Sequence, residues 1–258
     1  MTETTITKPC CECGVPVTRE PLVTPRFAHL AATMAVMCDD CGQAAEAAEL
    51  ERERRDAEQL RAERIAERVK ASGLPAKYHR LNIDALNHLA VVLIAAGKWA
   101  KNGGGLLLSG EVGVGKTTLA GAAAWLRLQS SAVIWTSAPL LFARLGSGFG
   151  SEQRDWALDV LSSKYGLVLD DIDKARPTEY GAEQVFLAID QRVEHEAPLL
   201  VTSNLAPSQL AEKWPSPYGE AIASRLVGYC RVIRIAGVDR RLAALGGPVA
   251  AIEAGDAS

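Results

Sequence analysis

Short apolar runs alternate with amphipathic stretches through the middle and the second half of this chain. The apolar runs predict buried strands at residues 106–108, 132–136, 166–171 and 199–202. Between them, apolar residues recur three and four positions apart, which predicts helices at residues 84–101, 119–126, 140–145, 156–161 and 183–194. Strands joined by helical crossovers form a parallel sheet with helices on both faces. The expected fold class is therefore α/β.

Residues 43–71 follow a different pattern. They contain no glycine, proline or aromatic residue, and opposite charges stand three or four positions apart, as in Glu51 and Arg55. The large apolar residues form a stripe too thin to bury a core: Leu50, Leu60, Ile65 and Val69. We expect one exposed helix that ends at the Gly73–Pro75 break, and that either binds a partner or acts as a semi-rigid spacer.

Composition limits the classes of protein that remain. With 258 residues and 48% apolar residues, the chain is long enough for a substantial core and an appendage. Its net charge of −3 gives no overall attraction to nucleic acid or membrane, so any DNA contact must be a local patch. No apolar run has the length of a membrane span, and the first residues do not resemble a signal peptide. We therefore expect a soluble, cytoplasmic protein.

Residues 110–118 have the strongest chemical signature. They read Gly-Glu-Val-Gly-Val-Gly-Lys-Thr-Thr, which fits G-x-x-x-x-G-K-[ST], and they lie between a predicted strand and a predicted helix, a context that a chance glycine-rich turn would lack. Such a loop points backbone N–H groups at an anion. Lys116 is expected to reach the β- and γ-phosphates, and the Thr117 hydroxyl to ligate Mg²⁺. The candidate ATP-binding residues are Gly110, Val112, Gly113, Val114, Gly115, Lys116, Thr117 and Thr118.

Polar residues at the ends of two later strands predict the rest of this site. Asp170 and Asp171 follow an apolar run, and the carboxyl ends of parallel strands meet the phosphate loop at one sheet edge. We expect Asp170 to hold Mg²⁺, directly or through water, and Asp171 to orient and deprotonate the attacking water. Asn204 follows the next strand, where it either hydrogen-bonds that water or the γ-phosphate, or is an ordinary turn residue.

Five of the six cysteines fall within residues 10–41. They form two C-x-x-C-G motifs, which in a cytosolic chain indicate metal rather than disulfides. Cys10, Cys13, Cys38 and Cys41 are the expected ligands of a structural Zn²⁺ site, because four thiolates leave no open position for catalysis. Cys11 competes with Cys10, His29 could replace a cysteine, and a redox pair or free thiols is the alternative. Cys230 lies in an apolar segment and is expected to be a buried small side chain.

The order GEVGVGKTT, LVLDDID, VTSNL, ASRL and DRR resembles the AAA+ ATPases of the DnaC and DnaI helicase-loader group over about residues 73–245. The IstB-like transposition ATPases share this core. The resemblance implies a P-loop AAA+ core with a parallel sheet flanked by helices, beside the zinc-binding module and the long helix. It also implies these roles: Walker A for Lys116 and Thr117, Walker B for Asp170 and Asp171, sensor 1 for Asn204, arginine finger for Arg225, and sensor 2 for Arg241 or its neighbour Arg240.

Two departures from this group bear on the mechanism. The group's wider AAA+ relatives carry Glu where this chain has Asp171, which would place the base one methylene further back and suits slow turnover. The arginine at the sensor-2 position is doubled, as Arg240 and Arg241, which leaves the register of that motif open.

The helix expected at residues 140–145 bears on DNA binding. In initiator-type AAA+ proteins a helix at the position of residues 140–145 faces DNA. Here that helix offers only Arg144 for a phosphate and Phe142 for stacking, and its leucines favour packing of Phe142 in the core.

Two classes of function follow from the resemblance. In the first, the chain is an ATP-hydrolysing helicase loader that binds a replicative DNA helicase through its amino-terminal module and places it on single-stranded DNA, as an ATP-dependent homo-oligomer with a hexamer as one form. In the second, it is an IstB-like ATPase that regulates a DNA transposase on duplex DNA. The appended cysteine module and helix favour a dedicated protein partner and so the loader. A metabolic kinase would have no use for Arg225.

The expected domain boundaries follow the changes of pattern. They are a zinc-binding module at residues 1–42, a charged connecting helix at 43–72, the AAA+ core at 73–246 and a flexible tail at 247–258.

Overall fold

The computed structural model describes residues 6–19, 35–79, 90–146 and 150–239. The chain divides into two compact units, residues 1–63 and 64–258. Within the described ranges, no helix is both long and apolar enough to cross a lipid bilayer.

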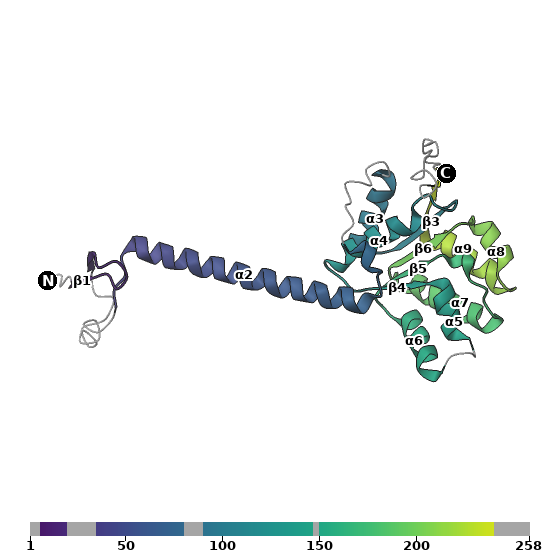
Figure 1. Ribbon diagram of the computed structural model, residues 1–258, viewed down its shortest axis with the longest axis horizontal. Coiled ribbons are helices and arrows are strands. Elements are labelled where there is room, and N and C mark those ends of the chain that lie inside the picture. Colours follow the sequence, from purple (N-terminus) through teal and green to yellow (C-terminus); the bar gives the residue numbers. More distant parts are fainter. Residues whose placement is uncertain (1–5, 20–34, 80–89, 147–149, 240–258) are drawn as a thin grey trace. The chain divides into compact units, whose positions relative to one another are not determined.

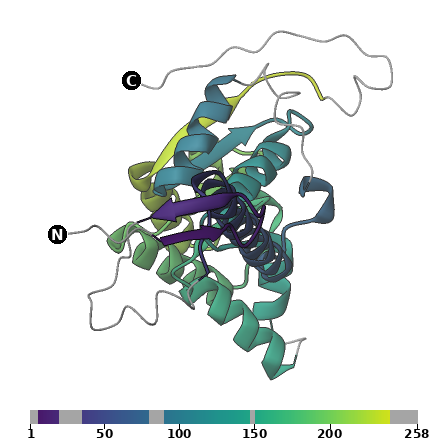
Figure 2. The same ribbon diagram turned by 90° about the vertical axis from the view of Figure 1, so that its left-hand side faces the viewer.

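The first unit is built around a small hairpin. Strand β1 (Ile6–Pro9) pairs antiparallel with β2 (Pro16–Arg19), as Figure 2 shows. Gly14 takes a φ of 76° in the turn between them, a conformation that glycine adopts without steric cost. A single bridge between Cys10 and Val36 ties the hairpin to the segment before the next helix. Of the side chains described before Arg64, Cys10 alone is buried, so this unit has almost no apolar core.

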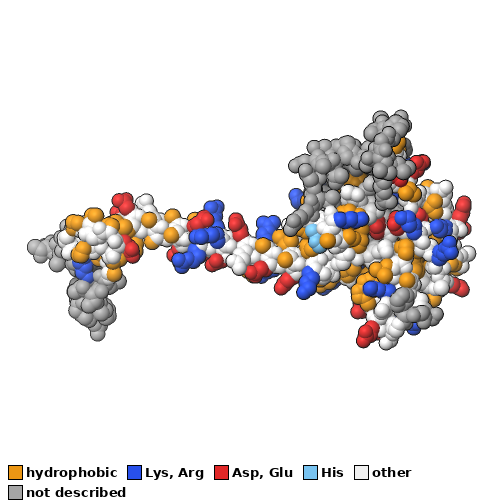
Figure 3. Space-filling model, in the orientation of Figure 1, with side chains coloured by type: hydrophobic (Ala, Val, Ile, Leu, Met, Phe, Trp, Pro, Cys, Tyr) orange, Lys and Arg blue, Asp and Glu red, His pale blue; other side chains and the backbone are white. Residues whose placement is uncertain are grey.

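Helix α2 (Asp39–Ser72) is the predicted charged helix, and it begins four residues earlier than expected. Asp39 and Asp40 occupy its first turn, where negative charge is favoured by the helix dipole. Lys, Arg, Asp and Glu side chains alternate along its surface in Figure 3. Leu50 and Leu60 are 56% and 49% exposed, and the predicted Glu51–Arg55 pair forms at 3.9 Å. The helix is therefore stabilised by local pairs rather than by a buried face over most of its length.

The last turns of α2 belong to the second unit. Arg68 donates a hydrogen bond to the Gln129 carbonyl at 3.3 Å, and Ser72 is buried. Gly73 ends the helix with a φ of 72°, and a Cβ there would lie 2.9 Å from the carbonyl oxygen of Trp135. The predicted glycine stop is thus required both by its backbone conformation and by its close approach to a neighbouring strand.

A parallel five-stranded sheet forms the centre of the second unit, with strand order β4-β5-β6-β3-β7 (Figure 1). Its strands are β3 (Gly105–Gly110), β4 (Val133–Ser137), β5 (Gly166–Asp170), β6 (Leu199–Ser203) and β7 (Cys230–Ile235). The helices are α3 (Ala90–Asn102), α4 (Lys116–Leu128), α5 (Ala138–Leu145), α6 (Ser151–Ser162), α7 (Glu179–Glu194), α8 (Pro207–Lys213) and α9 (Tyr218–Tyr229). Two short 3₁₀ turns are η2 (Ala76–Tyr78) and η4 (Ile172–Lys174).

Two apolar clusters cover the two faces of this sheet. Along β3, Leu107 packs into the cluster that contains α5 to α9, whereas Leu106 and Leu108 pack into the cluster that contains α3 and α4. Both faces of the strand are buried, which explains why it reads as a continuous apolar run. The register aligns Leu107 of β3 with Val201 of β6, and Val201 with Leu169 of β5. This alignment brings the carboxyl ends of β3, β5 and β6 to one edge.

The sequence analysis missed three strands (β1, β2 and β7) and two helices (α8 and α9), and it shifted several helix boundaries. No strand was predicted after residue 202, but residues 230–235 form β7 at the edge of the sheet, paired with β3. Arg231 and Arg234 are exposed on this edge strand and interrupt the apolar pattern that marks a central strand. Helix α7 starts at Glu179 rather than at 183, because the Thr178 hydroxyl caps it by accepting the Gly181 N–H. The predicted start of α3 at residue 84 lies outside the described residues.

Candidate nucleotide site and thiol cluster

The phosphate loop connects the end of β3 to the start of α4. Gly110, Gly113 and Gly115 have φ values of 146°, 82° and 102°, which side chains rarely adopt. Close contacts add a second requirement, because a Cβ on Gly110 would overlap the Ile235 carbonyl and one on Gly113 would overlap the Asp239 carboxylate. The glycine spacing thus lets the loop turn tightly into the N-terminus of α4, the part of a helix that attracts anions.

Lys116 is the first residue of α4 and folds back over the loop. Its Nζ donates hydrogen bonds to the carbonyl oxygens of Gly110 at 2.8 Å and Glu111 at 2.6 Å, and the residue is only 5% exposed. Burial lowers the pKa of Lys116, and the carboxylates of Asp173 and Asp171 oppose that shift. The ammonium group is therefore held against two carbonyl oxygens of the loop, in the lining of the pocket described below.

Asp170 lies at the carboxyl end of β5 and is 7% exposed. Thr202 on β6 donates its hydroxyl hydrogen to Asp170 Oδ1 at 2.7 Å and accepts the Asp171 N–H at 2.8 Å. These two hydrogen bonds fix the orientation of the Thr202 hydroxyl and hold the Asp170 carboxylate. Burial raises the pKa of Asp170, and hydrogen bonds from Thr202 and Thr117 oppose the shift. A carboxylate and a threonine hydroxyl in contact are hard oxygen donors, so Asp170 and Thr117 fit the requirements of Mg²⁺.

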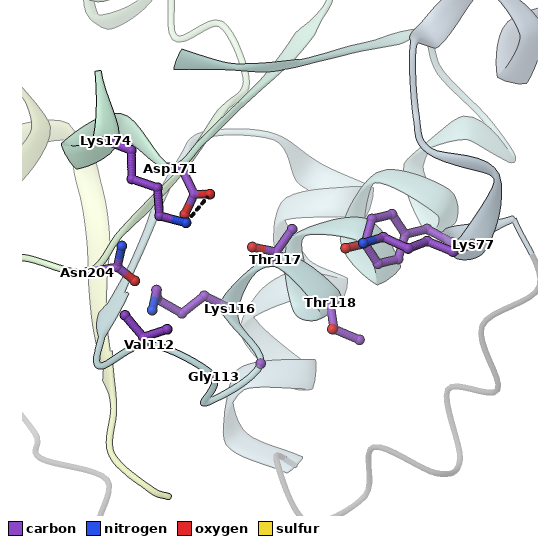
Figure 4. A pocket seen from close by; sticks show the side chains of 11 residues that line it. Lys77, Val112, Gly113, Lys116, Thr117, Thr118, Asp171, Lys174 and Asn204 are labelled. Carbon is purple, nitrogen blue, oxygen red and sulfur yellow. Dashed lines mark hydrogen bonds and ion pairs between the residues drawn. The ribbon is translucent and has the colours of Figure 1, made fainter. Parts of the chain in front are cut away.

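Asp171 has a left-handed backbone conformation, with a φ of 56°. Such a conformation is uncommon for a residue with a side chain and is often found at functional sites. Its Oδ2 forms an ion pair with Lys174 Nζ at 2.7 Å, as Figure 4 shows. The carboxylate therefore faces the pocket while one of its oxygens is held by a lysine three residues later.

Asn204 is fixed by a residue that the sequence analysis did not single out. Asp173 Oδ1 accepts the Asn204 N–H at 2.7 Å, and Asp173 Oδ2 accepts the side-chain amide N–H at 2.8 Å. Asp173 is 5% exposed, and its own carbonyl oxygen accepts a hydrogen bond from Lys213. The sequence signal that could have identified Asp173 is that it is a third acidic residue, two positions after Asp171.

These side chains meet in one pocket with a volume of about 320 Å³ (Figure 4). Eight of the predicted residues line it: Val112, Gly113, Gly115, Lys116, Thr117, Thr118, Asp171 and Asn204. Three residues that were not predicted complete the lining: Lys77, Tyr78 and Lys174. Val114 is instead buried in the apolar cluster under α4. Asp170 lines an adjoining pocket that shares Thr117. Lys77 and Tyr78 come from η2, whose position at the site no spacing rule predicted.

The predicted arginines lie elsewhere. Arg225 on α9 does not line this pocket, and it forms an ion pair with Asp190 on α7 at 2.6 Å, with half of its side chain exposed. Arg240 and Arg241 lie outside the described residues. In α5, Phe142 is buried and packs edge-on against Trp214, as the packing alternative predicted, and the Arg144 guanidinium lies 3.9 Å from the ring centre of Trp156.

The first unit brings four thiols together. One sulfur from each of Cys10, Cys13, Cys38 and Cys41 lies within 4.8 Å of all the others. Cys11 is exposed and outside this cluster, and His29 is outside the described residues. The Cys38 N–H donates to Cys10 Sγ at 3.3 Å, and the Cys41 N–H donates to Cys38 Sγ at 3.4 Å. N–H groups of Cys13, Cys38 and Glu12 lower the pKa of Cys10 to about 6. Four convergent sulfurs, of which those of Cys10 and Cys38 accept backbone N–H groups, fit a tetrahedral Zn²⁺ ion.

Cys230, the first residue of β7, is buried as predicted, with its sulfur against Gly105 of β3. Burial raises the pKa of its thiol to about 12, so it stays a neutral packing group.

We expect about one tightly held zinc ion per chain, because the first unit has too few buried side chains to fold without a metal. Elemental analysis of the purified full-length protein checks this. Cys13→Ser should lose the metal, whereas the matched change Cys11→Ser should retain it. Protein without metal, or equal retention by both variants, would contradict the four-thiolate site.

A protein family described as IstB-like ATP binding protein matches residues 43–244 of this chain. Among curated proteins, the chain is similar to one from Mycobacterium tuberculosis that is described as an ATP-binding protein in an insertion sequence. The two are 27% identical over 150 residues, which make up 57% of this chain and 60% of that protein. The match therefore spans less than two thirds of the length of this relative.

Solved structures show the same fold. DnaI is similar with a TM-score of 0.54 and 20% identity over 64% of this chain and 96% of the DnaI chain. A Streptococcus pyogenes protein described as a primosome component has a TM-score of 0.53 and 23% identity over 66% and 93% of the two chains. Domain III of the Thermotoga maritima replication initiation protein DnaA has a TM-score of 0.51 and 15% identity over 66% and 71%. The predicted α/β fold, with a parallel sheet flanked by helices, is confirmed.

Proposed function

This chain belongs to the family of IstB-like ATP binding proteins, and we propose that its pocket binds ATP with Mg²⁺ and hydrolyses it. The observation that carries the proposal is the convergence of Lys116, Thr117, Asp171 and Asn204 on one pocket. In the proposed mode, the loop N–H groups and Lys116 offset the charge of the phosphates. Thr117 and Asp170 would hold Mg²⁺, which supplies further positive charge beside the phosphate oxygens.

Hydrolysis then requires a positioned water molecule. Asp171 accepts a proton from this water as its oxygen attacks the γ-phosphorus, the bond to the β-phosphate oxygen breaks, and ADP and phosphate leave. Asn204 hydrogen-bonds the same water or the γ-phosphate, and Asp173 fixes the orientation of Asn204 through two hydrogen bonds. Because the aspartate is one methylene shorter than a glutamate, which places the base further from the water, we expect unstimulated turnover to be slow.

The finer function that we propose is helicase loading. The first unit offers a thiol cluster and a helix with exposed Leu50 and Leu60, a combination that has no part in nucleotide chemistry and suits a dedicated protein partner. Through it, the chain would bind a replicative DNA helicase. The ATP-bound core would assemble with further copies, place the helicase on single-stranded DNA and then release it on hydrolysis.

A second candidate is regulation of a DNA transposase. The observation that favours it is the sequence likeness to a mycobacterial protein described as belonging to an insertion sequence. Here the same ATP-bound oligomer would coat duplex DNA and direct the transposase. Both candidates use the same nucleotide site and differ in the partner and in the form of DNA.

We expect the full-length protein to co-elute with the host replicative helicase without ATP, and to bind single-stranded DNA weakly and only with ATP. Size-exclusion chromatography and fluorescence anisotropy with labelled single-stranded and duplex oligonucleotides measure these two interactions. As a control, a Cys13→Ser, Cys38→Ser variant should lose the helicase while still binding ATP. Tight ATP-dependent binding to duplex DNA, with no helicase binding, would reject the loader and support the transposition candidate.

A further inference from the structure

Lys174 presents a second cation to the nucleotide pocket. It is the last residue of η4, the turn that follows the Asp170–Asp171 pair, and it lies three residues after Asp171. Its side chain lines the pocket together with Lys116. Figure 4 shows both lysines on the side of the pocket where Asn204 and Asp171 lie. Its positive charge adds to the lowering of the Lys116 pKa, to which burial contributes most.

The two lysines differ in how firmly they are held. Lys116 is nearly buried and donates to two loop carbonyls, so its position is set by the loop. Lys174 has one carboxylate partner, Asp171, and half of its side chain is exposed. An exposed ion pair of this kind is weak and exchanges its partner easily. A phosphate group in the pocket carries more negative charge than a single carboxylate and competes for this ammonium group.

We propose that Lys174 exchanges Asp171 for the γ-phosphate of ATP, and thereby makes the pocket prefer ATP over ADP. The exchange has a second consequence, because the oxygen of Asp171 that Lys174 holds becomes available to the attacking water. With a diphosphate, the group that Lys174 contacts is missing and the Asp171–Lys174 pair stays formed. This inference rests on the proposed ATP site and identifies Lys174 as the residue that contacts the third phosphate.

Lys77 supplies a matched control in the same pocket. It lies at the far end from Asn204, beyond Thr118 in Figure 4, and its ammonium group is 4.8 Å from the ring centre of Tyr78. Removing its charge changes the electrostatics of the pocket without removing a contact to the third phosphate. Comparing variants of the two lysines therefore separates a general effect of pocket charge on nucleotide affinity from a specific contact with the third phosphate.

The test compares affinities for ADP and for a non-hydrolysable ATP analogue, measured by isothermal titration of the full-length protein with Mg²⁺. Lys174→Gln should weaken binding of the ATP analogue about 10-fold or more, as expected for a lost charge-assisted contact, and change ADP affinity less than about twofold. Lys174→Arg should retain the preference for the triphosphate. Lys77→Gln should alter both affinities by similar factors.

Equal weakening of both nucleotides by Lys174→Gln, or no change in either, would overturn the role of Lys174 while leaving the ATP site intact. A wild-type protein that binds neither nucleotide would instead overturn the proposed function itself. Because Lys174 is half exposed, Lys174→Gln should unfold at the wild-type temperature, and thermal unfolding of each variant verifies that its fold is preserved.

Discussion

Lys116→Ala should lose stable nucleotide binding, with an affinity about 100-fold or more below that of the wild type, because charge-assisted contacts to phosphate are among the strongest polar interactions. The loop N–H groups remain, but they carry only partial charges and cannot offset a triphosphate alone. A fluorescently labelled ATP analogue measures the change directly. Lys116 also donates to the Gly110 and Glu111 carbonyls, so its loss could disturb the loop. A measurement of the thermal unfolding temperature of the variant checks that the protein remains folded.

Asp171→Asn provides the matched variant for this experiment. It removes the proposed base while retaining a side chain of the same size, so it should bind the labelled nucleotide and fail to release phosphate. The pair separates binding from hydrolysis. Wild-type affinity in Lys116→Ala, or wild-type hydrolysis in Asp171→Asn, would contradict the roles that we propose for these two residues.

Arg225→Ala should retain ATP binding and lose about 10³-fold of stimulated hydrolysis, the effect typical of an arginine finger. The structure gives two reasons for expecting action on a neighbouring copy. Arg225 does not line the pocket of its own chain, and its ion pair with Asp190 is half exposed, so a phosphate on another copy can replace Asp190 at little cost. Phosphate release under conditions that assemble the protein on DNA is the measurement.

Mixing variants tests whether the site is shared between copies. Arg225→Ala has an intact pocket and Lys116→Ala has an intact arginine, so mixtures should recover part of the activity. Arg231→Ala removes an exposed arginine from β7 and serves as the control for a change in surface charge. Mixtures that stay inactive at every ratio would rule out a finger supplied by a neighbour.

The central strands could be predicted from the sequence because both of their faces are buried. Leu106, Leu107 and Leu108 face two different apolar clusters, so the run needs no alternation. Strand β7 escaped prediction because an edge strand can place Arg231 and Arg234 in solvent. Strand β4 lies at the opposite edge of the sheet, but none of its residues is exposed, so its apolar run was recognised.

The residues of the candidate site also differ in whether they could be predicted from the sequence. The phosphate loop and the strand-end residues Asp170, Asp171 and Asn204 could be predicted because their spacing and order are tied to the backbone. Asp173 and Lys174 could not be assigned, since their side chains act through contacts that depend on the 3₁₀ turn after β5. Lys77 and Tyr78 reach the pocket through tertiary packing, with Tyr78 lying against Gly121 of α4.

The most direct test of the account is isothermal titration of the full-length wild-type protein with ATP in the presence of Mg²⁺. The account predicts one binding site per chain, weaker binding when EDTA removes the Mg²⁺, and no binding in Lys116→Ala. Absence of binding at millimolar ATP, or binding that survives Lys116→Ala unchanged, would contradict the claim that this pocket is an ATP site.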